Sequence, residues 1–168
     1  MIAALDLSLT ATGWATLDPT GDLRWGTITP PARGHPIGAR LDHLRQAVAD
    51  LAADAHLVVL ETPVVRSPAA LTLGMVHGAV QHRLHELGRA VLLVAPATLK
   101  VLATGKGNAG KADVRGAART RLGYTGESDD EADACWLADL GARYLGWTRP
   151  PLPATHLRAM VKIHGVAA

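Results

Sequence analysis

The sequence IAALDLSLTATGWATL, residues 2–17, contains two apolar runs separated by a short segment of small and polar residues. The runs at residues 2–7 and 13–17 each have the length of a buried strand. A third run, at residues 23–28, follows the turn signal DPTGD. Three short strands joined by tight turns indicate an antiparallel meander at the start of the chain.

Beyond residue 30 the pattern changes to an alternation of helices and strands. Apolar residues recur at spacings of three and four from residue 37 to residue 51, which predicts a helix over residues 37–53. Continuous apolar runs at residues 57–60 and 90–94 are typical of buried parallel strands. Further helices are expected over residues 69–87, 96–102, 112–122 and 129–145. This order predicts an α/β fold with a mixed five-stranded sheet, three antiparallel strands followed by parallel strands, flanked by helices.

The length of 168 residues fits one ordinary domain. We assign the domain to residues 1–146 and treat the Pro-rich residues 147–168 as a C-terminal tail, which could be a DNA-contacting arm or a disordered end. The single cysteine, Cys135, excludes an intrachain disulfide and favours a reducing compartment. No apolar run is long enough to span a membrane, and no signal peptide is visible. We therefore expect a cytoplasmic protein.

Charge is distributed unevenly, although the net charge of the whole chain is only +2. Residues 96–124 carry six basic side chains and one acidic side chain. Residues 125–139 carry six acidic side chains and no Lys or Arg. A basic block beside an acidic block suits a protein that holds a polyanion with one and a cation with the other. Two solvated helices of opposite charge would give the same pattern.

Four carboxylates stand at positions that can converge. Asp6 lies in an otherwise apolar strand, where a lone acid is costly unless it is paired or bound to metal. Glu61 ends a second buried strand, and Asp130 and Asp133 share one face of a predicted helix. Taken singly, each acid has a structural explanation: a buried partner for Asp6, solvent for Glu61, and the positive end of a helix dipole for the other two.

Clustered negative charges repel one another unless cations lie among them. Mg²⁺ is the expected ion, with Mn²⁺ as its substitute, because it prefers carboxylate oxygens and keeps several waters. Two such ions about 4 Å apart can stabilise the attacking and leaving oxygens of a phosphodiester displacement. The four acids therefore predict a metal-dependent nuclease.

Several motifs, in order, resemble the RuvC family of Holliday-junction resolvases. They are IAALDLSLTATGWA at 2–15, VVLE at 58–61, LTLGMVHG at 71–78, VAPATLK at 94–100, the basic loop at 105–114 and DEADA at 130–134. The resemblance covers about residues 1–146. It implies an RNase H-like fold, a homodimer and Mg²⁺-dependent nicking of four-way DNA junctions by paired symmetric cuts. It assigns catalysis and metal binding to Asp6, Glu61, Asp130 and Asp133.

The resemblance also implies a role for the helix at residues 69–87 and for basic side chains. The helix would be a dimer element, in which Gly74 and Gly78 permit close contact or simply pack on the sheet. Lys106 and Lys111 match basic positions near the scissile phosphate, and Lys100 is a further candidate. Arg115 and Arg119, four residues apart on a helix, could hold a phosphate backbone.

The chain departs from the family just after its second carboxylate. Resolvases of this family tend to carry an aromatic there that stacks on a base, whereas this chain reads TPVVR at residues 62–66. Arg66 could stack instead. Asp129 also competes with Asp130 as a ligand, and the spacing to Asp133 favours Asp130. A short, divergent resolvase of this kind would suit a phage or another mobile element.

Three other functions fit part of the pattern. A phosphotransferase of the actin and sugar-kinase superfamily also begins with a strand, an Asp and a small-residue turn, but needs two such domains. A non-catalytic nucleic-acid-binding module would not need all four carboxylates. A nuclease for flaps, replication forks or RNA–DNA hybrids would use the same acids, because selectivity depends on the geometry of the dimer.

Overall fold

The computed structural model describes residues 1–63 and 68–163. Its five strands form one sheet in the order β3-β2-β1-β4-β5. The strands β1 (Ile2–Asp6), β2 (Thr12–Leu17) and β3 (Leu23–Ile28) pair antiparallel, while β4 (Leu57–Glu61) and β5 (Val91–Val94) continue the sheet parallel to β1. The expected mixed sheet is confirmed, including the meander.

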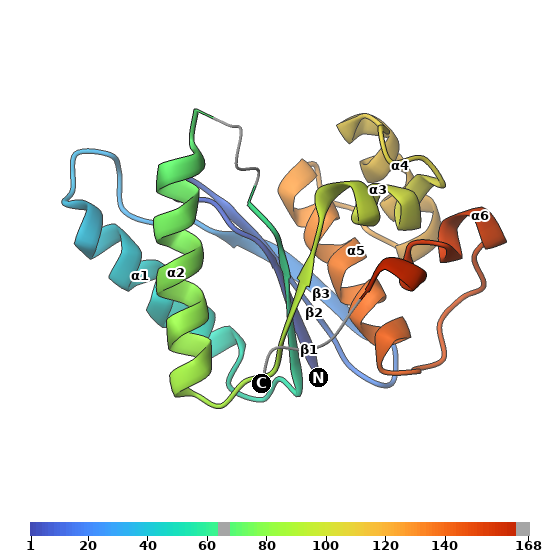
Figure 1. Ribbon diagram of the computed structural model, residues 1–168, viewed down its shortest axis with the longest axis horizontal. Coiled ribbons are helices and arrows are strands. Elements are labelled where there is room, and N and C mark those ends of the chain that lie inside the picture. Colours follow the sequence, from blue (N-terminus) through green and yellow to red (C-terminus); the bar gives the residue numbers. More distant parts are fainter. Residues whose placement is uncertain (64–67, 164–168) are drawn as a thin grey trace.

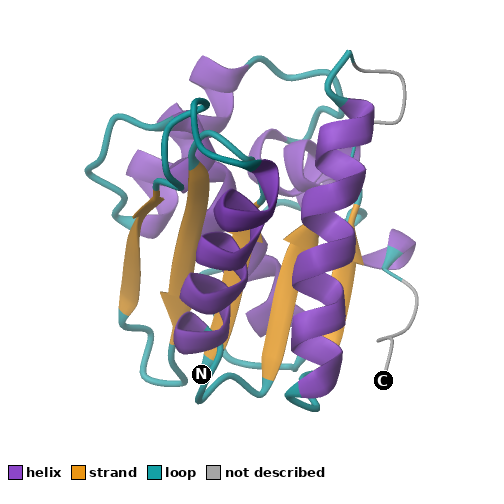
Figure 2. Cartoon of the chain, turned by 90° about the vertical axis from the view of Figure 1, so that its left-hand side faces the viewer, coloured by secondary structure: helices purple, strands orange, loops and turns teal. Residues whose placement is uncertain are grey.

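Helices cover both faces of the sheet (Figure 1). The helices α1 (Ile37–Leu51) and α2 (Ala70–Glu86) lie together on one face, which Figure 2 shows in front of the strands. On the other face lie α3 (Pro96–Thr104), α4 (Lys111–Leu122) and α5 (Asp129–Tyr144). The boundaries agree with the turn chemistry: Pro96 occupies the first turn of α3, and Gly88, with φ +64°, follows the end of α2.

Side-chain alternation along the strands divides the core into two layers. Ile2 and Ala4 of β1, with Val59 of β4, pack on the side of α5. Ala3 and Leu5 lie in the layer beneath α1 and α2. Because alternate residues share a face, the final residues of β1 and β4 both point toward α5.

The described part of the tail is folded onto the α3–α5 side of the domain. It contains α6 (Ala154–Leu157) and a 3₁₀ turn at Met160–Lys162. Apolar side chains of residues 147–163 pack against the core, and the buried His156 ring makes a 2.8 Å hydrogen bond through Nδ1 to the carbonyl oxygen of Leu102. Residues 147–163 therefore share the core of the domain. In the part of the chain that is described, no helix has the length and apolarity needed to cross a membrane.

Candidate active site

Two of the four carboxylates lie at the carboxyl ends of adjacent parallel strands. Leu5 of β1 is paired with Leu60 of β4, so Asp6 and Glu61, each one residue further on, leave the sheet at the same edge. Because side chains alternate along a strand, the side chains of Asp6 and Glu61 both point toward α5. Both side chains are half-buried. The sequence predicted this neighbourhood only if the two strands were adjacent, and they are.

The other two carboxylates reach this edge because α5 begins directly against β2. Gly13 is the register partner of Asp6, and a Cβ atom added at Gly13 would lie 2.1 Å from the backbone oxygen of Asp130. No side chain fits between the strand and the helix at this point. The glycine therefore permits a close approach that carries Asp130, and Asp133 one turn later, to the end of β1.

Hydrogen bonds fix the first turn of α5. The Ser128 hydroxyl accepts from the backbone N–H of Glu131 as the N-cap. The Tyr124 hydroxyl makes hydrogen bonds to the carbonyl oxygen of Ser128 at 2.8 Å and to Oε2 of Glu131 at 3.0 Å. The Thr27 hydroxyl donates to Oε1 of Glu131 at 2.7 Å. Glu131 thus links α5 to β3 and to the segment before α5, while its neighbour Asp130 faces the other acids.

Burial and the charges of neighbouring acids raise the pKa values of three of the four carboxyl groups. Burial, followed by the charges of Asp133 and Asp130, raises the pKa of Asp6 to about 7. Burial, followed by Asp6 and Asp133, raises the pKa of Glu61 to about 8. Burial is also the largest cause that raises the pKa of Asp133 to about 6, against the lowering effect of Lys111. Clustered, partly desolvated carboxylates produce shifts in this direction.

The donor set fits a hard divalent cation. Among the described residues, no hydrogen bond or ion pair is made by the carboxylates of Asp6, Glu61 or Asp133, so their charge is not compensated by a close partner. Within residues 1–63 and 68–163, no group of three or more His, Cys, Asp or Glu side chains is arranged so that it could hold a metal ion. The acids are carboxylates with raised pKa values at one edge of the sheet, so their donor chemistry suits Mg²⁺, although their spacing in this structure does not form a complete ligand set.

Two lysines flank the carboxylates. Lys111, the first residue of α4, places Nζ 3.7 Å from Oδ1 of Asp130 and lowers the pKa of Asp133. Lys100 of α3 also lowers the pKa of Glu61 and of Asp133. The two lysines come from the basic block and face the acidic block, as the charge pattern predicted.

The other basic candidates are placed differently. Arg115 donates to Oδ1 of Asp129 at 2.8 Å, and Arg119 pairs with Glu127 at 2.6 Å, so both guanidinium groups are engaged within the chain. The pairing of Asp129 with Arg115 favours Asp130 as the member of the cluster. Lys106 is exposed and lines a pocket of about 540 Å³ between α4 and α6. Arg66 lies outside the described residues.

Comparison with known proteins places this arrangement in a family. A crossover junction endodeoxyribonuclease RuvC of Xanthobacter autotrophicus is 34% identical over 154 residues, which are 86% of this chain and 90% of that protein. A second one, from Hyphomonas neptunium, is 33% identical over 153 residues, 86% of this chain and 91% of that protein. The chain belongs to the RuvC family. No protein-family model matches it.

Solved structures of RuvC have the same fold. RuvC of Thermus thermophilus superposes with a TM-score of 0.70 at 21% identity, covering 89% of this chain and 99% of that one. The same protein in complex with a Holliday junction substrate gives a TM-score of 0.70 at 20% identity, covering 89% and 98%. These matches confirm the RNase H-like fold. As a RuvC-family member, the chain belongs to a group of metal-dependent nucleases.

Sequence reasoning missed two features of the site. It used the Thr-Gly pair at residues 12–13 only as part of a motif, although the glycine sets the distance between β2 and α5. It also assigned no role to Glu131, which holds the start of α5. A glycine directly across from a strand-borne Asp is a detectable signal, but only after the register of β1 and β2 is known.

Proposed function

We propose that this chain is a metal-dependent endodeoxyribonuclease that resolves four-way DNA junctions by paired symmetric nicks. The observation that supports it best is the meeting of Asp6, Glu61, Asp130 and Asp133 at one edge of the sheet. There, burial first and the charge of at least one other of the four acids second raise the pKa values of Asp6, Glu61 and Asp133. Membership of the RuvC family supports the substrate class. The chain spans nine-tenths of the length of those relatives.

In this proposal the four carboxylates hold Mg²⁺, for which Mn²⁺ can substitute. When bound, the ions would supply an activated water and stabilise the leaving 3′ oxygen of the phosphodiester. The carboxylates would orient the ions, since the oxygens of Asp6, Glu61 and Asp133 make no hydrogen bond or ion pair within the described chain and Asp130 meets only the Nζ atom of Lys111 there, at 3.7 Å. Lys100 and Lys111, which flank the acids, hold the scissile phosphate by charge. Because α5 packs closely against β2, Asp130 and Asp133 stay near Asp6 and Glu61.

The direct test is cleavage by Asp6→Asn. We expect the variant to lose cleavage by at least about a thousandfold, because one ligand of the metal site is gone and each factor of ten corresponds to about 1.4 kcal/mol. We expect junction binding to persist. Asp54→Asn, in an exposed turn before β4, is the matched control and should cut at the wild-type rate. If Asp6→Asn cuts junctions at the wild-type rate, the assigned site is wrong.

The substrate class is tested separately with labelled junctions, flaps, duplexes and RNA–DNA hybrids, each with Mg²⁺ and with EDTA. Paired symmetric nicks confined to the junction would support resolution. Cutting of all branched or hybrid substrates would support a nuclease but would contradict selectivity for four-way junctions. Binding without any cutting would favour a non-catalytic binding module. We expect the enzyme to act in the cytoplasm, where bacterial DNA lies.

We further propose that two copies associate through α2. Gly74 and Gly78 lie on its exposed face, with no atom within 4 Å of a Cβ added at either position. Leu71, 80% exposed, and Met75, 38% exposed, lie on the same helix. Small residues permit close helix contact, and exposed apolar side chains supply area to bury. Leu71→Asp should convert a dimer to a monomer in light scattering; a wild-type monomer with and without DNA would contradict paired cutting.

The remaining basic candidates, Lys106, Arg115, Arg119 and Arg66, stay predicted DNA contacts. Arg115 and Arg119 would have to exchange the ion pairs that they make within the chain for contacts with phosphate. Exposed ion pairs contribute at most about 1 kcal/mol each, so such an exchange is energetically feasible.

A further inference from the structure

A second basic site lies on the α1–α2 side of the sheet, whereas Lys100 and Lys111 belong to α3 and α4 on the other side. It is a pocket of about 340 Å³ between the loop that follows β1, the segment before α1 and the first turn of α2. The described lining has two arginines, three hydroxyl side chains and no acidic residue; its polar members are Ser8, Thr10, Arg33, Arg40 and Thr72. Such a lining suits an anion.

Arg40 carries a buried positive charge without a carboxylate partner. Its side chain is only 9% exposed. The guanidinium donates through Nε to the carbonyl oxygen of Pro31 at 2.9 Å and through Nη2 to the carbonyl oxygen of Leu9. In the described part of the chain, no residue accepts from Nη1, and no acid pairs with this arginine. Nη1 is not among the buried atoms that lack a partner, so it is accessible and can donate to an anion in the pocket, while the two carbonyl oxygens hold the guanidinium in place.

The other polar groups are available to the same anion. Arg33 is exposed, and no ion pair to a described residue engages it. The hydroxyls of Ser8 and Thr10 lie 2.9 Å apart and order the loop, which Thr12 anchors by donating to the carbonyl oxygen of Ser8 at 2.8 Å. A hydroxyl group that makes one such bond keeps capacity for another. The pocket therefore offers two cations, one of them fixed in place, beside an ordered rim of hydroxyls.

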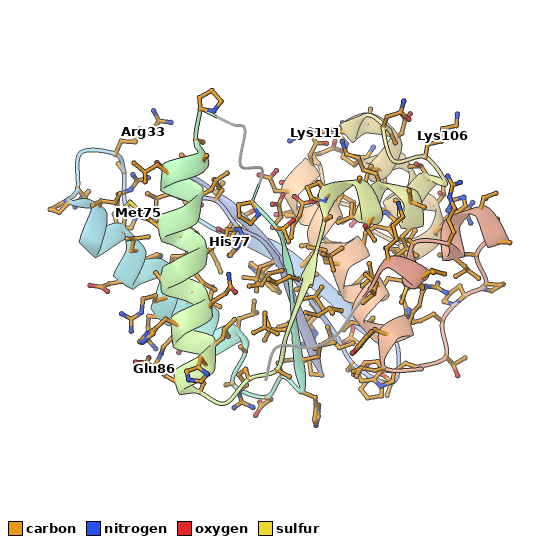
Figure 3. All side chains as sticks on the ribbon, viewed as in Figure 1. Arg33, Met75, His77, Glu86, Lys106 and Lys111 are labelled. Atoms are coloured by element: carbon orange, nitrogen blue, oxygen red, sulfur yellow. The ribbon has the colours of Figure 1, made fainter. Side chains whose placement is uncertain are left out.

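The position of the pocket relates it to the cluster of acids. Ser8 and Thr10 follow Asp6 by two and four residues, so the pocket begins where β1 ends. Figure 3 shows Arg33 and Lys111 at the same end of the molecule, Arg33 on the side of α1 and α2 and Lys111 on the side of α4. The two basic sites therefore lie at the same end of the molecule, on the two sides of the sheet. Arg33 and Arg40 belong to neither the basic block nor the family motifs.

We propose that this pocket binds a backbone phosphate of the substrate DNA, other than the one that is cut. The inference rests on the proposed function for the identity of the substrate. The pocket orients the strand on the α1–α2 side, whereas the lysines hold it on the α3–α4 side. Because it reads phosphate and not bases, it adds affinity and salt dependence without sequence preference.

The test measures binding, so that it does not depend on cleavage. Dissociation constants for a four-way junction and a linear duplex are determined by fluorescence anisotropy in EDTA over a range of salt concentrations. Arg33→Ala should weaken binding to both DNAs by about three- to tenfold and lower the slope of log K against log salt by about one, as expected for one lost phosphate contact. Arg33→Lys should restore most of the slope, because it keeps the charge.

Arg24→Ala is the matched control. Arg24 is an exposed arginine at the start of β3, its one ion pair with a described residue is to Asp22, and it lies at the opposite end of the sheet from Asp6. Its removal changes the net charge equally and should leave both the affinity and the slope as in the wild type. Equal effects of Arg24→Ala and Arg33→Ala would show that only overall charge matters and would overturn the proposal.

The remaining outcomes separate this proposal from the proposed function. If Arg33→Ala keeps the wild-type slope while the wild type cuts junctions, the pocket proposal fails alone. If the wild type binds DNA with an Arg33-dependent slope but cuts nothing, the proposed function fails alone. Failure of the wild type to bind either DNA would overturn both. Thermal stabilisation of the wild type by inorganic phosphate, lost in Arg33→Ala without any change in DNA binding, would assign the pocket to a free anion and overturn the DNA contact.

Discussion

Helix α5 carries two acids, Asp133 and Asp139, whose electrostatic surroundings are opposite. Asp139, in the second half of the helix, is fully buried and lies between two arginines, 2.7 Å from Nε of Arg143 and 2.6 Å from Nε of Arg149. Asp133, less than two turns earlier, makes no such pair with any described residue, and its pKa is raised. The helix is one rigid element, so the difference arises from what faces each acid.

The comparison separates structural from functional acids. At Asp139 the chain supplies its own cations, and one of them, Arg149, comes from the segment after residue 146 and ties that segment to the domain. At Asp133 the facing groups are Asp6 and Glu61, and the nearby lysines compensate the negative charge only in part. A buried acid whose counter-charge is absent from the chain is a candidate for an external cation.

The largest expected effects come from the same substitution at these two positions. Asp133→Asn should lower the rate of junction cleavage by at least about a thousandfold, because a metal ligand is lost, and should leave the free energy of unfolding unchanged or higher. Asp139→Asn should lower the free energy of unfolding by about 3–5 kcal/mol, because two half-buried arginines lose their partner. Urea unfolding and cleavage assays on both variants check this. Equal destabilisation by the two substitutions would remove the distinction.

A smaller effect is expected when α5, which carries Asp130 and Asp133, is moved relative to the strands that carry Asp6 and Glu61. Such a change alters no acid. Gly13→Ala would place a Cβ atom 2.1 Å from the backbone oxygen of Asp130, so the start of α5 must move. We expect cleavage to fall by about a hundredfold, as displacements near 1 Å can do, with a higher Mg²⁺ concentration needed for half-maximal rate. Gly116→Ala, in α4 with no atom within 4 Å of the added carbon, is the control. An unchanged Mg²⁺ requirement in Gly13→Ala would contradict the positioning role.

The smallest expected effect is the dependence of stability on pH. The raised pKa values of Asp6, Glu61 and Asp133, about 7, 8 and 6, mean that the folded chain binds more protons than the unfolded chain between about pH 4 and 8. In EDTA, these three groups should therefore favour the folded state most below about pH 4, and stability should fall as the pH rises from about 4 to 8.

Mg²⁺ should reverse this trend, because it binds the ionised carboxylates: the stabilisation it gives is expected to be larger at pH 8 than at pH 5. Asp6→Asn should flatten the pH profile in EDTA, because it removes one of the three raised carboxyl groups. Urea titrations at four pH values, with and without Mg²⁺, measure both effects. A rise in the stability of the metal-free protein between pH 5 and pH 8 would contradict mutual repulsion within the cluster.

Much of the fold could be predicted from local patterns, because they follow from the period of each element. The strand at residues 57–60 and the helix at residues 69–87 were found within a residue or so of β4 and α2. The antiparallel pairing of the first three strands followed from the tight turns between them, whereas the place of β4 beside β1 did not, because β2, β3 and α1 separate the two strands in the chain. The described part of the tail was not predicted to fold, because its packing depends on single contacts such as His156 with Leu102 and Arg149 with Asp139.

The candidate site was predictable in its membership but not in its geometry. Asp6 and Glu61 stand out in sequence because an acid inside or at the end of an apolar strand conflicts with its surroundings. Arg115 and Arg119 look in sequence like a phosphate-binding pair, yet the structure engages both with acids of the segment before and at the start of α5. A charge pattern in the sequence shows which charged groups are present, but it does not show which of them form ion pairs with one another.

The sequence by itself determined the α/β class, the family and the four acids, because hydrophobic period and the cost of burying charge are local properties. The tertiary structure alone decided three things: that Gly13 lets α5 touch β2, that Asp139 is neutralised while Asp133 is not, and that Arg33 and Arg40 meet in one pocket. Each depends on residues far apart in the chain. Their distances are set by packing, and no local pattern encodes such distances.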